Sequence, residues 1–185
     1  MIPELLKETE ERMHKSVEAT RHEFSLIRTG RASPAILEHV KVDLYGATMP
    51  LNQVASVSVP DPRQLMIMPF DRNALAAIEK GILKSDVNLT PNNDGSAIRL
   101  NIPPLNEERR RELIKQVHQK AEAGRVGVRN ARHDSVKKLQ NARKAGELPE
   151  GEEKRGEESV QKLVDRFIQE IDRLTKAKEA EMMEV

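Results

Sequence analysis

Three long segments of the chain repeat their hydrophobic residues with helical spacing. The first covers residues 3–28, and its apolar positions follow one another at steps of 4, 3, 4 and 3. These positions are Met13, Val17, Thr20, Phe24 and Ile27. The spacing is typical of a helix that buries one narrow seam against partner helices. Thr29 and Gly30 interrupt the seam, and Pro34 prevents the helix from continuing.

The second and third segments cover residues 105–144 and 150–183, with Gly146 and Pro149 between them. The second seam follows Val117, Ala121, Gly124, Val128, Ala131, Ser135 and Ala142, with Leu139 beside Lys138. The third seam follows Val160, Val164, Phe167, Ile171 and Leu174, widened by Leu163 and Ile168. At 1.5 Å per residue the second helix is about 55–60 Å long. Three such helices with matching seams predict an elongated antiparallel bundle.

The middle of the chain has a different pattern. Residues 40–45 alternate with the period of a strand before a turn at Gly46, and residues 54–59 and 65–68 are also strand-like. Asp71 can cap a short helix. Residues 87–90 and 97–102 flank Pro91-Asn92-Asn93-Asp94-Gly95, a sequence typical of a hairpin turn. These elements predict a small mixed α/β domain that is rich in strands.

The order of the segments predicts an α+β protein with one domain inserted into the other. Residues 1–29 and 105–185 form the three-helix bundle, and residues 30–104 form the inserted α/β domain. The two short connections between them predict a hinge, since glycine gives freedom at the first and prolines limit both. The hinge residues are Gly30, Arg31 and Pro34 in the first connection and Pro104, Leu105 and Asn106 in the second.

Composition narrows the class of protein. Only 37% of residues are hydrophobic and 33% are charged, which suits long helices with wide solvated faces. The absence of cysteine excludes disulfides and thiolate chemistry. The N-terminus lacks the apolar run of a signal peptide, and no segment approaches a membrane span. We therefore expect a soluble, cytoplasmic protein.

Charge is distributed very unevenly along the chain. The net charge is +1, yet residues 105–145 carry 12 basic and 5 acidic side chains, a net charge of +7. Residues 146–185 carry 7 basic and 12 acidic side chains, a net charge of −5. One interpretation is a face for an anionic partner, with nucleic acid as the first candidate. The other is that the basic and acidic helices pair with each other.

Arginines dominate one face of the basic helix. Arg125, Arg129 and Arg132 follow one another at steps of 4 and 3 and share what we call the arginine stripe. The planar N–H groups of a guanidinium have the geometry to bond phosphate oxygens. Only two acidic residues, Glu122 and Asp134, lie near the stripe in the sequence. Lys137, Lys138 and Lys144 are instead expected to pair with the acidic third helix. Base stacking needs exposed aromatic side chains, and this chain has almost none available. We therefore expect the stripe to contact backbone phosphates and to recognise the shape of the nucleic acid rather than its bases.

Motifs for catalysis are missing from the sequence. The five histidines form no close ligand pair, so we expect no metal site and no cofactor. Gly124-Arg125-Val126-Gly127 superficially resembles a phosphate loop, but it lies inside a helical repeat and follows no strand. The sequence has no Walker motif, no nucleophile elbow and no Ser/His/Asp pattern. We therefore expect no enzymatic activity and no catalytic residue.

Several motifs, taken together, resemble those of the ribosome recycling factor family. They are Arg28-Thr29-Gly30-Arg31-Ala32-Ser33-Pro34, Pro103-Pro104-Leu105-Asn106-Glu107-Glu108-Arg109-Arg110 and Val126-Gly127-Val128-Arg129-Asn130-Ala131-Arg132, with Asp71-Arg72 and Ser96-Ala97-Ile98-Arg99 in the middle domain. The resemblance covers the whole chain. Gly127 departs from it, since the family usually has alanine there, and His133 replaces a common arginine.

The resemblance implies an L-shaped monomer the size of a tRNA that binds the post-termination ribosome. The bundle would lie on large-subunit rRNA, and the factor would split the subunits together with elongation factor G, which hydrolyses GTP. The residues that the resemblance assigns to rRNA are Arg132 first and then Arg129, with Arg110, Arg28 and Arg31 as weaker candidates at the hinge end. Arg125 joins them as a member of the arginine stripe. For the three at the hinge end, a structural pairing is an equal alternative. The other class that remains open is a helical adaptor or chaperone that docks protein partners through its charged faces.

Overall fold

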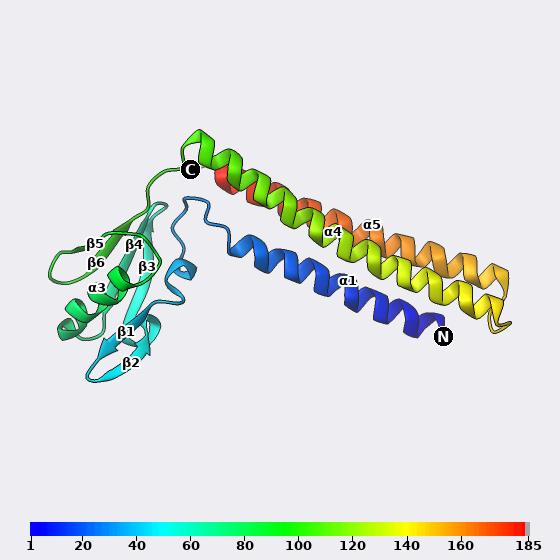
Figure 1. The fold of residues 1–185 in the computed structure, drawn as a ribbon, viewed down its shortest axis with the longest axis horizontal. Helices are drawn as coiled ribbons and strands as arrows, with labels where there is room; N and C mark the ends of the chain where they lie inside the picture. The colour runs from blue at the N-terminus through cyan, green and yellow to red at the C-terminus, as the bar shows by residue number, and fades with distance from the viewer. Residues whose placement is uncertain (184–185) are drawn as a thin grey trace. The chain divides into compact units, whose positions relative to one another are not determined.

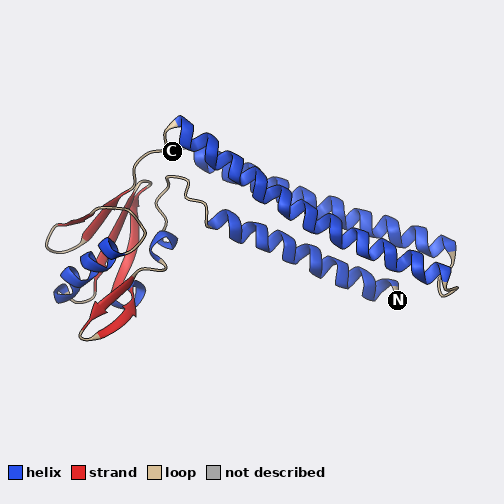
Figure 2. Ribbon diagram, viewed as in Figure 1, coloured by secondary structure: helices blue, strands red, loops and turns tan. Residues whose placement is uncertain are grey.

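The structure is a computed structural model that describes residues 1–183 (Figure 1). The chain divides into two compact units. Met1–Ile27 and Glu108–Met183 form the first, which we call the bundle, and Arg28–Glu107 forms the second, which we call the α/β unit. Long helices make up the bundle, and strands with short helices make up the α/β unit (Figure 2). The predicted α+β fold class is confirmed. Residues 184–185, assigned to the bundle from the sequence, lie outside the described residues.

The bundle contains α1 (Ile2–Ser25), α4 (Glu107–Lys144) and α5 (Glu150–Met183). The last two agree closely with the predicted helices. The first ends earlier than the predicted residue 28, because the N–H groups of Leu26 and Ile27 bond carbonyls only three residues back and the last turn tightens. Gly124 and Gly127 lie inside α4, so the glycine-rich sequence is helical as predicted.

Charged contacts between the helices establish their directions. Between α1 and α4 these contacts are Glu8 with Lys138, Arg12 with Asp134 and Glu23 with Lys120. Between α4 and α5 they are His118 with Glu179, Arg125 with Asp172 and Arg143 with Glu153. In both sets the numbers rise along one helix as they fall along the other. Helix α4 therefore runs antiparallel to both of its neighbours, as Figure 1 also shows.

The predicted seams form the core of the bundle with two changes, the first being that Ile27 lies beyond the end of α1 and is only half-buried. The seam residues of α4 are all buried, as are Met13, Val17, Thr20 and Phe24 of α1. In α5 the seam continues from Ile171 to Thr175, and the predicted Leu174 is only half-buried. Thr175 is accepted in the core because its hydroxyl donates to the Ile171 carbonyl at 2.8 Å. Helical spacing allows a step of either 3 or 4, and the packing selects 4 here.

The α/β unit contains two antiparallel sheets. Its elements are η1 (Pro34–Leu37), β1 (Lys41–Leu44), β2 (Ala47–Pro50), α2 (Leu51–Val54), β3 (Ala55–Asp61), β4 (Gln64–Pro69), η2 (Arg72–Ala74), α3 (Leu75–Lys84), β5 (Pro91–Asn93) and β6 (Ile98–Asn101). Strands β1 and β2 form a hairpin, and the second sheet has the order β3-β4-β6-β5. The core is aliphatic and includes Val42, Leu65, Ile67, Ile78, Ile98 and Leu100, all fully buried.

Two predictions for the α/β unit were wrong in detail. The hairpin strand lies at Pro91–Asn93, where a turn was predicted, and pairs with β6. The turn comes later because Asp94 Oδ1 accepts from the N–H groups of Ser96 and Ala97 and closes the chain there. Strand β2 was not predicted, since four residues ending in proline show no clear alternation. The predicted cap at Asp71 is present, where Oδ1 accepts from Asn73 N.

Candidate nucleic-acid interface

Helix α4 carries the arginine stripe on an uninterrupted helical surface of 38 residues. Gly124, Val128 and Ala131 are buried on the adjoining face of the same turns, which fixes the rotation of the helix. The stripe therefore lies outside the core, as the periodicity predicts. Its three arginines differ sharply in what surrounds them.

Arg125 is neutralised inside the bundle. Its Nε and Nη2 donate to Asp172 Oδ1 of α5 at 3.0 and 2.7 Å, and its Nη1 donates to Glu122 at 3.2 Å. Burial alone would lower the pKa of Arg125, but the hydrogen bonds to the two carboxylates outweigh it and the pKa is raised. Only 20% of the side chain is exposed. Besides Glu122, which is near in the sequence, Asp172 approaches Arg125 from another helix.

Arg129 is exposed but also has a carboxylate partner. Its Nη1 donates to Glu122 Oε1 at 2.9 Å, and half of its side chain is exposed. The hydrogen bonds from Arg129 and then Arg125 hold the pKa of Glu122 below its ordinary value. One carboxylate therefore serves two arginines of the stripe. Because the pair is exposed and screened by solvent, an incoming phosphate can displace Glu122 at small cost.

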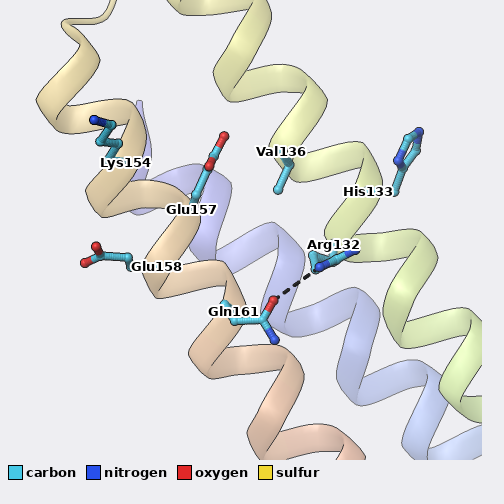
Figure 3. A pocket seen from close by; sticks show the side chains of 7 residues that line it. All are labelled: Arg132, His133, Val136, Lys154, Glu157, Glu158 and Gln161. Carbon is cyan, nitrogen blue, oxygen red and sulfur yellow. Dashed lines mark hydrogen bonds between the residues drawn. The ribbon is translucent and has the colours of Figure 1, made fainter.

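Arg132 has no carboxylate partner among residues 1–183. Its Nη1 donates to the side-chain oxygen of Gln161 on α5 at 3.3 Å. The two side chains point toward one another across the groove between the helices (Figure 3). The groove has a volume of about 430 Å³ and is lined by Arg132, His133, Val136, Lys154, Glu157, Glu158 and Gln161. The positive charge of Arg132 is therefore exposed, and no carboxylate among the described residues balances it.

The three arginines near the predicted hinge differ in their surroundings. Arg28 belongs to the α/β unit, where its Nη1 donates to the Val87 carbonyl at 3.0 Å. This contact supports the structural alternative for Arg28. Arg31 is exposed in the same unit. Arg110 is half-buried, and its Nε has no hydrogen-bond partner within the described chain.

Of the predicted hinge residues, Gly30 has the most distinctive conformation. Its φ is +78°, in the left-handed region that favours glycine. Arg31 and Pro34 follow it, with Pro34 opening the short helix η1 behind a Ser33 cap. Pro104, Leu105 and Asn106 precede α4 and lie outside any helix or strand.

The predicted pairing with the acidic third helix was wrong for Lys138, and neither Lys137 nor Lys144 forms an ion pair with that helix among residues 1–183. Lys138 pairs with Glu8 of α1 at 3.2 Å, and Lys120 pairs with Glu23 of the same helix at 3.1 Å. Contacts from α4 to α5 come from Arg125, Arg143 and His118 instead. The reason is geometric: helix α4 packs against both α1 and α5, and different residues of α4 face each of them. The opposite charges of the two helices do not decide which residues meet.

The aromatic residues also depart from expectation in part. Tyr45 and Phe70 of the α/β unit are 78% and 70% exposed, so the chain does have exposed aromatic side chains. The Tyr45 hydroxyl donates to Asp71 Oδ2 at 3.0 Å, which raises the pKa of Tyr45. In the bundle, Phe24 and Phe167 are both buried. Contacts of the stripe to phosphate rather than to bases remain a prediction for this unit.

The described residues contain neither a metal-binding cluster nor a membrane-spanning helix. No three side chains of histidine, cysteine, aspartate or glutamate within residues 1–183 lie close enough together to hold a metal ion. No helix in this part of the chain has the length and apolarity needed to cross a membrane.

Sequence comparison identifies the family. The family model described as "Ribosome recycling factor" matches residues 20–183. The chain belongs to the ribosome recycling factor family. The ribosome-recycling factor of Carboxydothermus hydrogenoformans is 51% identical over 100% of both chains. That of Thermosynechococcus vestitus is 54% identical over 97% of this chain and 99% of its own. The resemblance inferred from the motifs is confirmed.

Solved structures of ribosome recycling factors have the same fold. A solution structure of the ribosome recycling factor matches with a TM-score of 0.77 and 42% identity, over 100% of this chain and 98% of the other. A second match has a TM-score of 0.65 and 49% identity over 98% of both chains. It is the T. thermophilus ribosome recycling factor in models that also contain E. coli elongation factor G, bound to the E. coli post-termination complex.

Proposed function

We propose that this chain binds the post-termination ribosome and, with elongation factor G and GTP, separates the subunits so that they can be reused. The observation that carries the proposal is similarity to ribosome recycling factors along the entire chain, at about half of all positions. A relative with 49% identity is placed with elongation factor G on a post-termination complex. The motifs that differ from the family pattern, at Gly127 and His133, remove no residue of the arginine stripe.

The bundle is the unit that we propose to bind large-subunit rRNA. Arg132 supports this role most strongly, because its exposed guanidinium has an amide as its partner and no carboxylate. Arg129 can join it by giving up Glu122. Arg125 is reassigned to holding α4 against α5, since its carboxylate partners and its partial burial disfavour a ligand contact. Arg110 and Arg31 remain weaker candidates, and Arg28 fits its structural contact better.

Movement of the α/β unit is the second part of the proposal. We propose that the domains are residues 1–29 with 105–185 and residues 30–104, joined by the two hinge connections, with bounds two or three residues from those of the two compact units. Elongation factor G would act on the α/β unit while the bundle stays bound to rRNA. The positive φ of Gly30 supports a role for this residue in the hinge, since other residues would be strained there.

We further propose that the protein is a cytoplasmic monomer with no catalytic step and no cofactor of its own. GTP hydrolysis belongs to elongation factor G. Membership of a family of translation factors supports this assignment, as does the lack of a nucleotide-binding motif in the sequence.

Subunit splitting measured by light scattering tests the proposal. Post-termination ribosomes are mixed with this protein, elongation factor G and GTP, and each component is left out in turn. The expected result is a fall in scattering only when all three are present. Persistent scattering in the complete mixture would contradict the proposal. A helical adaptor, the alternative class, would give that result and would also show little salt-sensitive binding to ribosomes.

A further inference from the structure

Arg132 is held by a short chain of side chains that begins on the neighbouring helix. Gln161 Oε1 accepts from Arg132 Nη1 at 3.3 Å, while Gln161 Nε2 donates to Asp165 Oδ1 at 3.0 Å. Gln161 and Asp165 are one helical turn apart on α5, so the second contact forms within that helix. The side-chain amide of Gln161 can accept from Arg132 and donate to Asp165 at the same time in only one of its two flipped orientations. Asp165 therefore orients Gln161, and Gln161 orients the guanidinium.

The chemical nature of this partner distinguishes Arg132 from the rest of the arginine stripe. Arg125 and Arg129 both bond carboxylates, which cancel their charge locally. Gln161 accepts a hydrogen bond without a negative charge, so the guanidinium is positioned while its charge stays available. Glu157 and Glu158 line the same groove, but neither forms an ion pair with Arg132 among residues 1–183. The carboxylate of Asp165 bonds Gln161 rather than Arg132, so the Gln161 side chain separates it from the guanidinium.

We propose that Gln161 is a positioning residue for rRNA binding, with Asp165 as its support. This proposal rests on the proposed function, since it assumes that Arg132 contacts phosphate. Phosphate affinity depends on the charge that a guanidinium can bring and on its having the correct direction before contact. A neutral acceptor satisfies both requirements, whereas a carboxylate at position 161 would satisfy only the second. Sequence reasoning could not find this role, because a single glutamine on a solvated helix face carries no signal.

The decisive variant is Gln161→Glu, measured as ribosome affinity over a salt series. The new carboxylate should pair with Arg132, lower affinity by a fewfold and reduce the slope of log affinity against log salt by up to roughly 0.7 to 0.9. Gln169→Glu is the matched control, because Gln169 is an exposed glutamine of the same helix without a side-chain partner in the described chain. It adds the same charge and should leave the slope unchanged.

A second variant separates direction from charge. Gln161→Leu removes the acceptor and leaves Arg132 charged, so affinity should fall a fewfold while the slope stays at the wild-type value. Circular dichroism of all variants checks that the exposed substitutions leave the helices intact. A slope effect specific to Gln161→Glu is not expected from a purely structural residue.

The outcomes separate the two proposals. If Arg132→Ala weakens binding and lowers the slope, but Gln161→Glu behaves like Gln169→Glu, the role of Gln161 is overturned and the proposed function stands. Wild-type affinity of Gln161→Leu would also overturn the positioning role. If wild-type protein does not bind ribosomes, or Arg132→Ala binds as wild type does, the rRNA contact itself is overturned and the role of Gln161 with it.

Discussion

Thr20 of α1 fills the space that a side chain at Gly124 of α4 would need. A Cβ atom built at Gly124 would lie 2.2 Å from Thr20 Oγ1 and 3.2 Å from Ile171 Cδ1. The Thr20 hydroxyl is itself fixed, because it donates to the Ser16 carbonyl at 2.9 Å. A glycine in a helix costs about 1 kcal/mol relative to alanine. At this position the close approach of three helices offsets that cost.

Gly124→Ala should therefore destabilise the protein despite its better helix propensity. Overpacking a core costs about 1–3 kcal/mol, which exceeds the gain of about 1 kcal/mol from the backbone. In a Thr20→Ala background the clash with the hydroxyl is gone, and the same substitution should be neutral or stabilising. Urea unfolding of the four proteins gives the coupling energy.

Gly151→Ala is the control for this cycle. No atom lies within 4 Å of a Cβ at Gly151, so alanine there should stabilise α5 by up to about 1 kcal/mol. An additive cycle, with no coupling between positions 20 and 124, would show that the contact has no energetic weight.

Arg125→Ala should affect stability rather than binding. Removing this guanidinium leaves Asp172 without its arginine partner, at a cost of about 1 kcal/mol for a partly exposed pair, while Glu122 keeps Arg129. Since Arg125 is assigned to the contact between α4 and α5, the salt dependence of ribosome binding should not change. Urea unfolding and a salt series of ribosome binding measure the two effects. A lower salt slope with unchanged stability would return Arg125 to the interface.

Asp94 should make the stability of the α/β unit depend on acid. Its carboxylate accepts from the N–H groups of Ser96 and Ala97 and from the Ser96 hydroxyl, and these contacts lower the pKa of Asp94 to about 2. A carboxyl whose pKa is depressed by folding stabilises the folded state above its unfolded pKa. That contribution is lost as the pH falls from about 4 through about 2.

The comparison of wild type with Asp94→Asn tests this dependence. The variant should unfold at a lower urea concentration at pH 7, and the difference should shrink as the pH falls below 4. Asp61→Asn is the control, since Asp61 is exposed and its side chain forms no hydrogen bond within residues 1–183. A difference that is the same at every pH would mean that the charge of Asp94 does not contribute.

The long elements of the fold could be predicted from the sequence, and the short ones only in part. Many turns of consistent periodicity locate α4 and α5 almost to the residue. Strands of three or four residues give too few positions for alternation to be seen, which explains why β2 was not predicted and why β5 was taken for a turn. A side-chain contact such as that of Asp94 with Ala97 decides the position of the turn, and it appears only once the chain is folded.

For the candidate site, the sequence predicted which face of α4 the arginines share but not the partners of each arginine. Periodicity alone indicates that Arg125, Arg129 and Arg132 share a face of α4. It says nothing about which residue of α5 lies opposite each of them, because that depends on the register and rotation of the second helix. Asp172 beside Arg125 and Gln161 beside Arg132 are products of that register. The three arginines look equivalent in the sequence and differ in the structure.

Gly30→Val tests the hinge. A β-branched residue at a φ of +78° is strained, so the first connection should lose freedom or change direction. We expect subunit splitting to fall while ribosome affinity is kept, since the bundle is unchanged. Gly46→Val places the same strain, at a φ of +79°, in the turn between β1 and β2 and controls for it. Splitting at the wild-type rate in Gly30→Val would refute the hinge.

The salt dependence of ribosome binding by Arg132→Ala tests the central claim most directly. Binding of wild type, Arg132→Ala and Arg125→Ala is measured by co-sedimentation with vacant ribosomes over a range of salt concentrations. Arg132→Ala should bind more weakly, with a slope reduced by roughly 0.7 to 0.9, the contribution of one phosphate contact. Arg125→Ala should keep the wild-type slope. The same affinity and slope for Arg132→Ala and wild type would contradict the account.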